Sequence, residues 1–316
     1  MSSKMPNPCL NVLDVGHGSA AVLHDEGGTV IFDAGRGGQV GRHLNDSGID
    51  CLEMMILSHA DADHIGGAIA LLLKKDLGIG EVLLNPDSTK DSMVFEQLRY
   101  ALAEAKIEKG TRIIPALTTS TQISRKGATI EVLHPPAVKA LSGVGSKSTS
   151  GTCNTSNSMS AAIRVSEGSK SSVLLAADIE FDCIDEWKQQ PLHPSACVLV
   201  FPHHGGLPGV NDEYNAALFG YEITRMIGPE VVVFSNHRER FGNPRDGVLS
   251  GITKANPNIR FVCTQLPPRF QSSVSVDKCW SLHRSVDGGV IDGSICILFQ
   301  PSGVEIRFGN YNQLSD

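Results

Sequence analysis

The chain has 316 residues, of which 41% are hydrophobic and 19% charged, enough for a large core in one domain or in two fused halves. Its net charge of −7 excludes a general nucleic-acid coat protein, so any polyanion would meet a local basic patch or a metal. The opening MSSKMPNPCLN lacks the apolar segment of a signal peptide, and no apolar run reaches membrane-spanning length. We therefore expect a cytoplasmic protein without membrane contact. The eight cysteines form no Cys-x-x-Cys pair, which argues against a zinc-cysteine site.

Short strands and two helices follow one another through the first half of the sequence. The strands are short β-type or continuous apolar runs, separated by glycine turns such as GHGS. The second helix is amphipathic, and Asp91 or Ser92 is a suitable cap for it. The predicted elements of this half are strands at residues 9–15, 20–24, 29–33, 54–58 and 81–85, and helices at residues 64–78 and 91–109.

A polar segment, residues 141–160, interrupts this pattern. It contains SGVGSKSTSGTCNTSNSMS, which is typical of a long loop, and long loops in compact domains are often functional. The elements predicted after it are strands at residues 161–165, 172–176, 197–201, 231–235, 261–264, 295–299 and 304–308, and a helix at residues 181–189. We therefore expect a single domain over residues 1–316, with halves at roughly 8–140 and 157–310 joined by the Ser/Gly-rich loop 141–156. Strands in runs with helices between them predict two sheets packed between helices.

The stretch LSHADADHIGG, residues 57–67, crowds four metal-binding side chains into six positions. His59 and Asp61 are two residues apart and face the same way in an extended segment, and Asp63 and His64 can face the same point from the turn that follows. Imidazole and carboxylate suit zinc, manganese or iron, and four such groups exceed what one ion takes while leaving room for water. Two ions are therefore predicted. The alternative, a capping Asp63 and a buried structural His59, leaves the other two residues unexplained.

Three further stretches place polar residues at the ends of predicted strands. FDAG ends a strand at Asp33, LLAADIE ends one at Asp178, and VFPHHGG ends one at His203 and His204. Ligands of open α/β sheets gather at the carboxyl ends of strands, so these residues are candidates for the same site. For Asp178, a helix cap and a carboxylate that bridges two metals both remain open. One of the two histidines is expected to support the site without binding a metal.

The stretch VVVFSNHRERFGNP, residues 231–244, ends another predicted strand in polar residues. His237 is a candidate for orienting a substrate, and Arg238 and Arg240 are candidates for binding an anionic one. A solvated polar loop explains each of these three residues equally well when it is taken alone.

Taken in order, these stretches resemble the metallo-β-lactamase superfamily, and within it the hydrolase domain of the competence DNA-uptake channel, the ComEC type. The likeness is carried by LDVGHGSA, IFDAG, SHADADHIGG, NSMSAAI, LLAADIE, VFPHHGG and SNHRERFGNP, over roughly residues 9–250. Of these, His-x-Asp-x-Asp-His is the specific one. The resemblance implies an α/β (α+β) fold, a four-layer αββα sandwich of two mixed β-sheets flanked by helices. The membrane channel has no counterpart here, so the resemblance implies a stand-alone, soluble hydrolase domain and does not imply DNA uptake.

The same resemblance implies two divalent metal ions, Zn²⁺ or Mn²⁺, as cofactors. The implied ligands are His59 and Asp61 for the first ion, Asp63 and His64 for the second, Asp178 as the bridge and His203 as the last ligand. Asp63 and Asp178 are also the implied catalytic residues, because Asp63 would orient the nucleophile as well. The residues implied to support the ligands or meet the substrate are Asp33, Asn157, Ser160, His204, His237, Arg238 and Arg240.

The chain departs from the pattern of the resembled family at three positions. That family typically has Gln where this chain has His17, Asp where it has Ser19, and His where it has Asn243. His17 and His237 are the candidates for replacing the functions of the missing groups. Asp61 in place of a second imidazole favours manganese or iron without excluding zinc.

Two metals and a hydroxide bridging them predict a metal-dependent hydrolase. The leading prediction is a phosphodiesterase or nuclease, with a nucleic acid or another phosphodiester as the substrate. The alternatives are a small-molecule hydrolase acting on a lactone, thioester or amide, and a non-catalytic, metal-stabilised module. A nucleic-acid substrate predicts that the basic residues converge on the metal edge. Those residues are Lys74, Lys75, Arg125, Lys126, Lys147, Arg238, Arg240 and Arg245.

Overall fold

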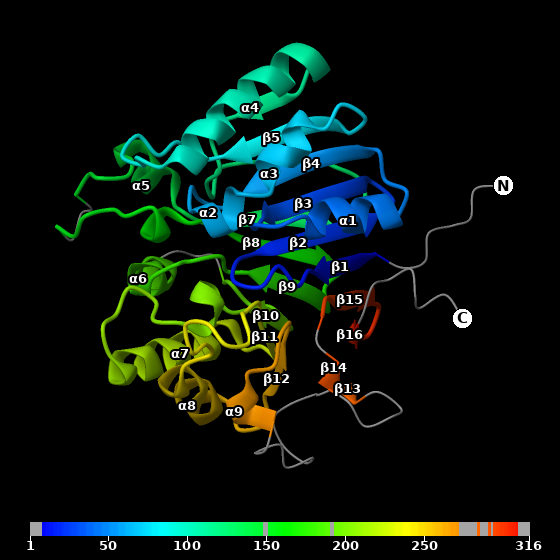
Figure 1. Cartoon of the computed structure of the whole chain (residues 1–316). Coiled ribbons are helices and arrows are strands. Elements are labelled where there is room, and N and C mark those ends of the chain that lie inside the picture. Colours follow the sequence, from blue (N-terminus) through cyan, green and yellow to red (C-terminus); the bar gives the residue numbers. More distant parts are fainter. Residues whose placement is uncertain are drawn as a thin grey trace.

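Two β-sheets lie face to face, and helices cover the outer face of each one (Figure 1). The computed structural model describes residues 8–147, 151–189, 193–271, 283–284, 290–291 and 293–308. The arrangement confirms the predicted four-layer αββα sandwich of the α/β class. Within those ranges, no helix has both the length and the apolar character needed to cross a membrane.

The first sheet is mixed and has the strand order β16-β15-β1-β2-β3-β4-β5-β6. The run from β3 to β6 is parallel, and the other neighbours are antiparallel. Its strands are β1 (Cys9–Val12), β2 (Ala20–Asp25), β3 (Gly28–Ala34), β4 (Cys51–Leu57), β5 (Gly78–Leu84), β6 (Arg112–Ile114), β15 (Ile295–Gln300) and β16 (Gly303–Phe308).

The second sheet is also mixed, in the order β12-β11-β10-β9-β8-β7, and is parallel from β9 to β12. Its strands are β7 (Thr129–His134), β8 (Ala162–Glu167), β9 (Ser171–Leu175), β10 (Val198–Val200), β11 (Val231–Phe234) and β12 (Arg260–Cys263). Two short strands, β13 (His283–Arg284) and β14 (Val290–Ile291), pair separately.

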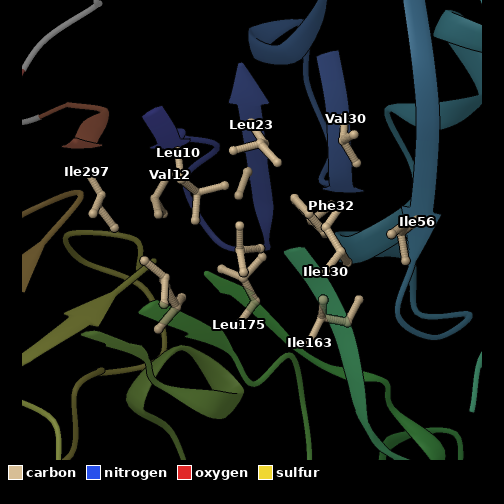
Figure 2. Close-up of a cluster of buried hydrophobic side chains, with 14 of the residues drawn as sticks. Leu10, Val12, Leu23, Val30, Phe32, Ile56, Ile130, Ile163, Leu175 and Ile297 are labelled. Carbon is tan, nitrogen blue, oxygen red and sulfur yellow. The ribbon is translucent and has the colours of Figure 1, made fainter. Parts of the chain in front are cut away.

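The core between the sheets takes side chains from both halves of the sequence. Figure 2 shows Leu10 and Phe32 of the first sheet facing Ile163 and Leu175 of the second. Strand alternation produces this arrangement, since successive side chains point to opposite faces. Each such side chain, when fully buried, contributes roughly 1.5–3 kcal/mol to stability. Because both halves supply this core, we propose that they form one domain.

The helices pack on the outer faces. Those over the first sheet are α1 (Gln39–Asp46), α2 (Ala62–Ile65), α3 (Ala68–Leu73) and α4 (Met93–Lys109). Those near the second sheet are α5 (Ala137–Ser142), α6 (Phe181–Gln189), α7 (Glu213–Ile227), α8 (Asp246–Ala255) and α9 (Pro268–Gln271). Ser92 caps α4 as predicted, since its hydroxyl accepts a hydrogen bond from the Phe95 amide at 3.2 Å.

The single helix predicted for residues 64–78 is wrong in its bounds. The structure has two shorter helices, α2 and α3, separated by Gly66 and Gly67, and Gly78 already begins β5. The break is tertiary in origin, because the Gly67 amide donates to the carbonyl of Ala34 at 2.7 Å. A Cβ on Gly67 would lie 2.5 Å from the carbonyl oxygen of Gly35, so only glycine allows this approach.

The predicted long loop is more ordered at its ends than its composition indicates. Helix α5 extends to Ser142, and Lys147 pairs with Cys153 in an isolated β-bridge. Residues 148–150 of this segment lie outside the described ranges.

A buried histidine pair joins α1 to the first sheet, on the face away from the second sheet. The Nε2 atoms of His24 and His43 lie 2.8 Å apart, and His24 Nδ1 lies 3.2 Å from the Thr29 hydroxyl. Burial, and then the neighbouring His43, lower the pKa of His24 to about 4, and burial also lowers the pKa of His43. One ring donates and the other accepts, so the contact needs at least one neutral ring and is lost when both rings are protonated.

We expect acid to destabilise the fold through this pair. His24 stays neutral in the folded chain down to pH about 4, whereas the unfolded chain binds a proton below about pH 6.5. The free energy of unfolding should therefore decrease by about 3 kcal/mol as the pH falls through this window. Denaturant titrations of the double variant His24→Leu/His43→Leu should show a weaker pH dependence than those of the unaltered chain, and exposed His193→Gln should not. An unchanged slope in the double variant would contradict the assignment.

Candidate metal centre

Loops from both sheets meet at one edge of the sandwich. In the first sheet, Asp33 lies at the end of β3 and His59 follows β4. In the second, Asp178 follows β9 and His204 follows β10. These strands are parallel to their neighbours β4, β5, β10 and β11, so their carboxyl ends share one edge, as expected for a ligand site.

Two cross-sheet hydrogen bonds hold this edge together. The amide of Ala161 donates to the Ser58 carbonyl at 3.0 Å, and the Ser235 hydroxyl donates to the Gly18 carbonyl at 2.7 Å. A Cβ on Gly18 would lie 2.4 Å from the Asp63 carbonyl oxygen, so glycine lets this loop reach the LSHADADHIGG stretch.

The first candidate ligand group consists of His59, His64 and Asp178, all buried. His64 Nε2 lies 3.3 Å from Asp178 Oδ1, and His59 Nε2 lies 3.9 Å from Asp178 Oδ2. The ligand atoms of the three residues lie within 4.8 Å of one another. The sequence predicted all three as ligands, and the fold brings them together from β4, α2 and β9.

The second candidate group consists of His17, Asp63 and His204. The Nε2 atoms of His17 and His204 each lie 3.4 Å from Asp63 Oδ2. Of these three, only Asp63 was predicted as a ligand, since His17 was noted as a departure and His204 as a supporting residue. The position of His17 in the glycine turn GHGS was the available sequence signal.

Asp178 of the first group also approaches the second, and its role as a bridge between two metals stays a prediction. Its Oδ1 lies 3.3 Å from His64 Nε2 and 3.9 Å from His204 Nε2. Its Oδ2 lies 3.6 Å from Nδ1 of His203, the predicted last ligand, which belongs to neither group. His203 stays a predicted ligand, and its other ring nitrogen is buried without a hydrogen-bond partner among the described residues.

Asp33 and Ser58 orient the first group. Asp33 Oδ2 accepts hydrogen bonds from His64 Nδ1 at 2.7 Å and from the Ser58 hydroxyl at 2.9 Å. Because that hydroxyl donates to Asp33, its lone pair accepts from His59 Nδ1 at 3.0 Å. Both rings then direct Nε2 toward Asp178, as expected for metal-binding histidines held by a partner on the other nitrogen. The predicted support of a histidine by Asp33 fits this geometry.

The backbone is strained around the site. Among the described residues, five non-glycine residues have a left-handed φ, between 47° and 67°. They are Asp33, Ala177, His203, His204 and Phe241. Such conformations cost free energy and persist where the surrounding structure imposes them, most often at functional sites. Four of the five lie at the strand ends that supply the ligands and the residues in contact with them.

Electrostatics match a site built for cations. Burial opposes charge on His64, but the carboxylates of Asp178 and Asp33 outweigh it and hold the pKa of His64 well above its usual value. Burial likewise opposes charge on Asp178, yet His64 and His203 hold its pKa well below the usual value. For Asp63, the neighbouring His204, whose Nε2 lies 3.4 Å from Oδ2, and the charge of His64 outweigh burial and lower the pKa. The carboxylates around His64 therefore favour a positive charge at this position.

His17 of the second group and His59 of the first group remain neutral near pH 7. Burial, followed by the charge of a neighbouring histidine, lowers the pKa of both His17 and His59 to about 4. Neutral imidazole is the form that binds a metal.

Asp61 lies at the rim, outside both groups. It forms an ion pair with Lys90, and its Oδ1 lies 3.9 Å from His59 Nε2. Its assignment as a ligand stays a prediction. Asp61 is the residue before α2, and its side chain forms no capping hydrogen bond. The Asp63 carboxylate lies near His17 and His204. Helix capping therefore explains neither carboxylate.

The predicted residues Asn157 and Ser160 bound a short 3₁₀ turn beside the first group. Ser160 is buried, and its carbonyl accepts a hydrogen bond from His134 Nδ1 at 2.7 Å. Its hydroxyl has no hydrogen-bond partner in the described part of the chain. The amide of the next residue, Ala161, donates to the Ser58 carbonyl, so this turn lies against the LSHADADHIGG stretch.

Of the predicted substrate residues, His237 and Arg240 line a pocket that also contains His17 and Asp63. Arg238 does not line it, and its amide donates to the Gln265 side chain at 2.8 Å.

Two of the basic residues named from the sequence, Arg125 and Lys74, lie away from this edge. Arg125 is buried in an ion pair with Asp25 and Glu53, at the other end of β2 and β4. Lys74 donates to Asn45 beside α1. Arg125 and Lys74 therefore add no basic surface beside the two ligand groups.

A protein-family model, the metallo-beta-lactamase superfamily, matches residues 13–197. The chain belongs to the metallo-β-lactamase superfamily. It is thereby a metal-dependent hydrolase by family, and the matched residues include the LSHADADHIGG stretch and Asp178. A search of curated proteins found no matching sequence.

Solved structures with the superfamily fold are similar at low identity. The metallo-β-lactamase fold protein YhfI from Bacillus subtilis is 17% identical, with a TM-score of 0.46 over 78% of this chain and 93% of that one. Zn²⁺-bound PqqB from Methylobacterium extorquens is 12% identical, with a TM-score of 0.45 over 90% and 99%. A diphosphatase from the PhnP family is 12% identical, with a TM-score of 0.43 over 75% and 91%.

The metallo-β-lactamase fold implies divalent metal ions, and the donor set fits them. Among the described residues, the Nε2 atoms of His59, His64, His203 and His204 are buried and have no hydrogen-bond partner. Leaving buried polar atoms unpaired is costly. The Nε2 atoms of His59, His64 and His204 lie 3.3–3.9 Å from an oxygen of Asp178. Imidazoles converging on carboxylates form a metal-ligand set, so the two groups are the places where ions would bind.

Proposed function

We propose that this metallo-β-lactamase-superfamily chain is a phosphodiesterase with two divalent metal ions, Zn²⁺ or Mn²⁺. One observation carries the proposal: the two three-residue ligand groups are adjacent, since Asp178 of the first lies 3.9 Å from His204 of the second, and the second group opens into a pocket that contains Arg240. When bound, the ions would activate water and neutralise charge developing on phosphate oxygens. A guanidinium beside them suits an anionic substrate, which a neutral lactone or amide would not require.

Asp63, Asp178 and Arg240 would have different roles in the reaction. Asp63 is held anionic by His204, so its carboxylate can accept a hydrogen bond from the attacking water and orient it. Asp178 keeps the two histidine groups at one place by contacting both. Arg240 would bind a non-bridging phosphate oxygen. The ComEC-type likeness of the sequence supports the same chemistry, and the buried Arg125 favours a short or single phosphodiester over a long duplex.

Metal removal tests this proposal. Dialysis against a chelator should abolish hydrolysis of bis(p-nitrophenyl) phosphate, and Mn²⁺ or Zn²⁺ should restore it, because the ligand groups supply no other electrophile. Elemental analysis should find two ions per chain. Failure of every divalent ion to restore activity would refute the metal requirement. A lactone and a β-lactam belong in the same assay, since faster hydrolysis of either would favour the small-molecule alternative.

A further inference from the structure

The pocket beside Asp63 contains residues that neither ligand group uses. It measures about 430 Å³, within the range of small-ligand pockets. Its lining residues are Val15, Gly16, His17, Arg36, Ala62, Asp63, His237, Arg240 and Phe241. Three of these, Arg36, Arg240 and Phe241, are exposed at its mouth.

Phe241 is placed as a stacking surface. Its ring lies 4.0 Å from that of His17, inclined by 29°, and the residue is still 57% exposed. Its backbone is left-handed, with a φ of 67°, an outlier for a bulky residue. The loop is held in this shape by its flanks, since Asn243 Nδ2 donates to the His203 carbonyl at 3.4 Å and the Arg245 amide donates to Gly205 at 2.8 Å. An exposed aromatic ring kept in a strained position points to a ligand.

Arg36 and Arg240 supply two guanidiniums without carboxylate partners in the described part of the chain. Arg112 and Arg164, by contrast, both pair with glutamates. The stem of Arg36 passes over Gly66, where an added Cβ would lie 2.9 Å from Arg36 Cγ. Unpaired guanidiniums beside a metal centre suit the oxygens of a phosphate.

The tautomer of His237 is set by its neighbours, so the ring nitrogen that donates can be named. Its Nδ1 lies 3.1 and 3.2 Å from the amides of Glu239 and Arg240, and amides can only donate. Nδ1 is therefore the acceptor, and the ring hydrogen is on Nε2.

We propose that this pocket recognises a nucleotide unit. Its base stacks on Phe241, Arg36 and Arg240 bind its phosphate, and the scissile ester is thereby held beside Asp63. Stacking tolerates any base because each has a π-face, so the site selects nucleotides over other phosphodiesters without reading sequence. The inference rests on the proposed function and names the class of its substrate.

Calorimetric binding of three probes tests the inference: adenosine 5′-monophosphate, ribose 5-phosphate and inorganic phosphate. All three probes carry a phosphate that can contact metal or arginine. The difference in affinity between adenosine 5′-monophosphate and ribose 5-phosphate therefore measures the contribution of the base. We expect the adenosine nucleotide to bind about tenfold more tightly than ribose 5-phosphate. Phe241→Ala should remove this preference, and Phe241→Tyr should keep it. Arg36→Gln/Arg240→Gln should weaken all three probes.

The matched control is Tyr214→Ala, which removes a 78% exposed aromatic ring on α7 outside the pocket lining and should leave the preference unchanged. Thermal melting of each variant confirms folding. Equal binding of the first two probes, a preference that survives Phe241→Ala, or no binding at millimolar concentration would overturn the inference. A chain that shows the Phe241-dependent preference but hydrolyses no phosphodiester refutes only the proposed function. A phosphodiesterase without the preference refutes only the inference.

Discussion

Replacing Asp178 by asparagine should abolish both metal binding and hydrolysis. Its two oxygens face different partners, with Oδ1 near His64 and His204 and Oδ2 near His59 and His203. Loss of the charge therefore affects both ligand groups, while the similar size of asparagine preserves packing. We expect the rate to fall by roughly 10³-fold or more, beyond the 10–100-fold typical of losing a residue that only supports a ligand. Rates with bis(p-nitrophenyl) phosphate and metal content by elemental analysis are the measurements.

Two variants calibrate this result. Asp33→Asn changes a residue that contacts His64 only through Nδ1, so its effect should stay within the 10–100-fold range. Asp185→Asn changes an exposed carboxylate on α6, paired with Lys188, and should alter neither rate nor metal content. If Asp178→Asn retains two ions and full activity, the bridging role is wrong.

Much of the fold follows from local sequence patterns. The apolar runs of β4, β9, β10 and β11 predicted strands because buried parallel strands are apolar throughout. Helices α7 and α8 escaped prediction, although α7 carries a capping Asp212 and a terminal Gly228 in the left-handed conformation. Those signals were present in the sequence. The break between α2 and α3 was not readable there, because it depends on the contact of Gly67 with Ala34 across the sheet edge.

The site was predictable to the level of its motifs but not of its ligand groups. His59, His64 and Asp178 could be named because each directly follows or lies near a strand end in a specific motif. The choice between His203 and His204 depends on two consecutive left-handed residues, a backbone path that no periodicity encodes. His17 reaches Asp63 only because Gly18 allows its loop to contact the motif, which is again a tertiary effect.

A second large effect is expected on stability, from Arg125→Ala. Arg125 binds both carboxylate oxygens of Asp25, at 2.6 and 2.7 Å, and also binds Glu53. The side chains of Arg125 and Asp25 are 1% and 0% exposed. The Asp25 carboxylate also accepts from the amides of Gly27 and Ala128, so one network ties the end of β2 to the segment that leads into β7 of the other sheet.

Removing the guanidinium leaves a buried carboxylate without its counter-charge, which costs about 3–5 kcal/mol in comparable pairs. Denaturant titration of the metal-free chain measures this loss of unfolding free energy. Arg125→Lys should recover only part of it, because an ammonium cannot bind both oxygens in the same plane. The matched control is Arg112→Ala, which breaks an ion pair with Glu81 on a side chain that is 67% exposed and should cost about 0–1 kcal/mol. Equal losses in the two alanine variants would mean that the Arg125 network does not hold the two sheets together. A loss confined to Arg125 would show that the charge binds the sandwich at the end opposite the metal centre.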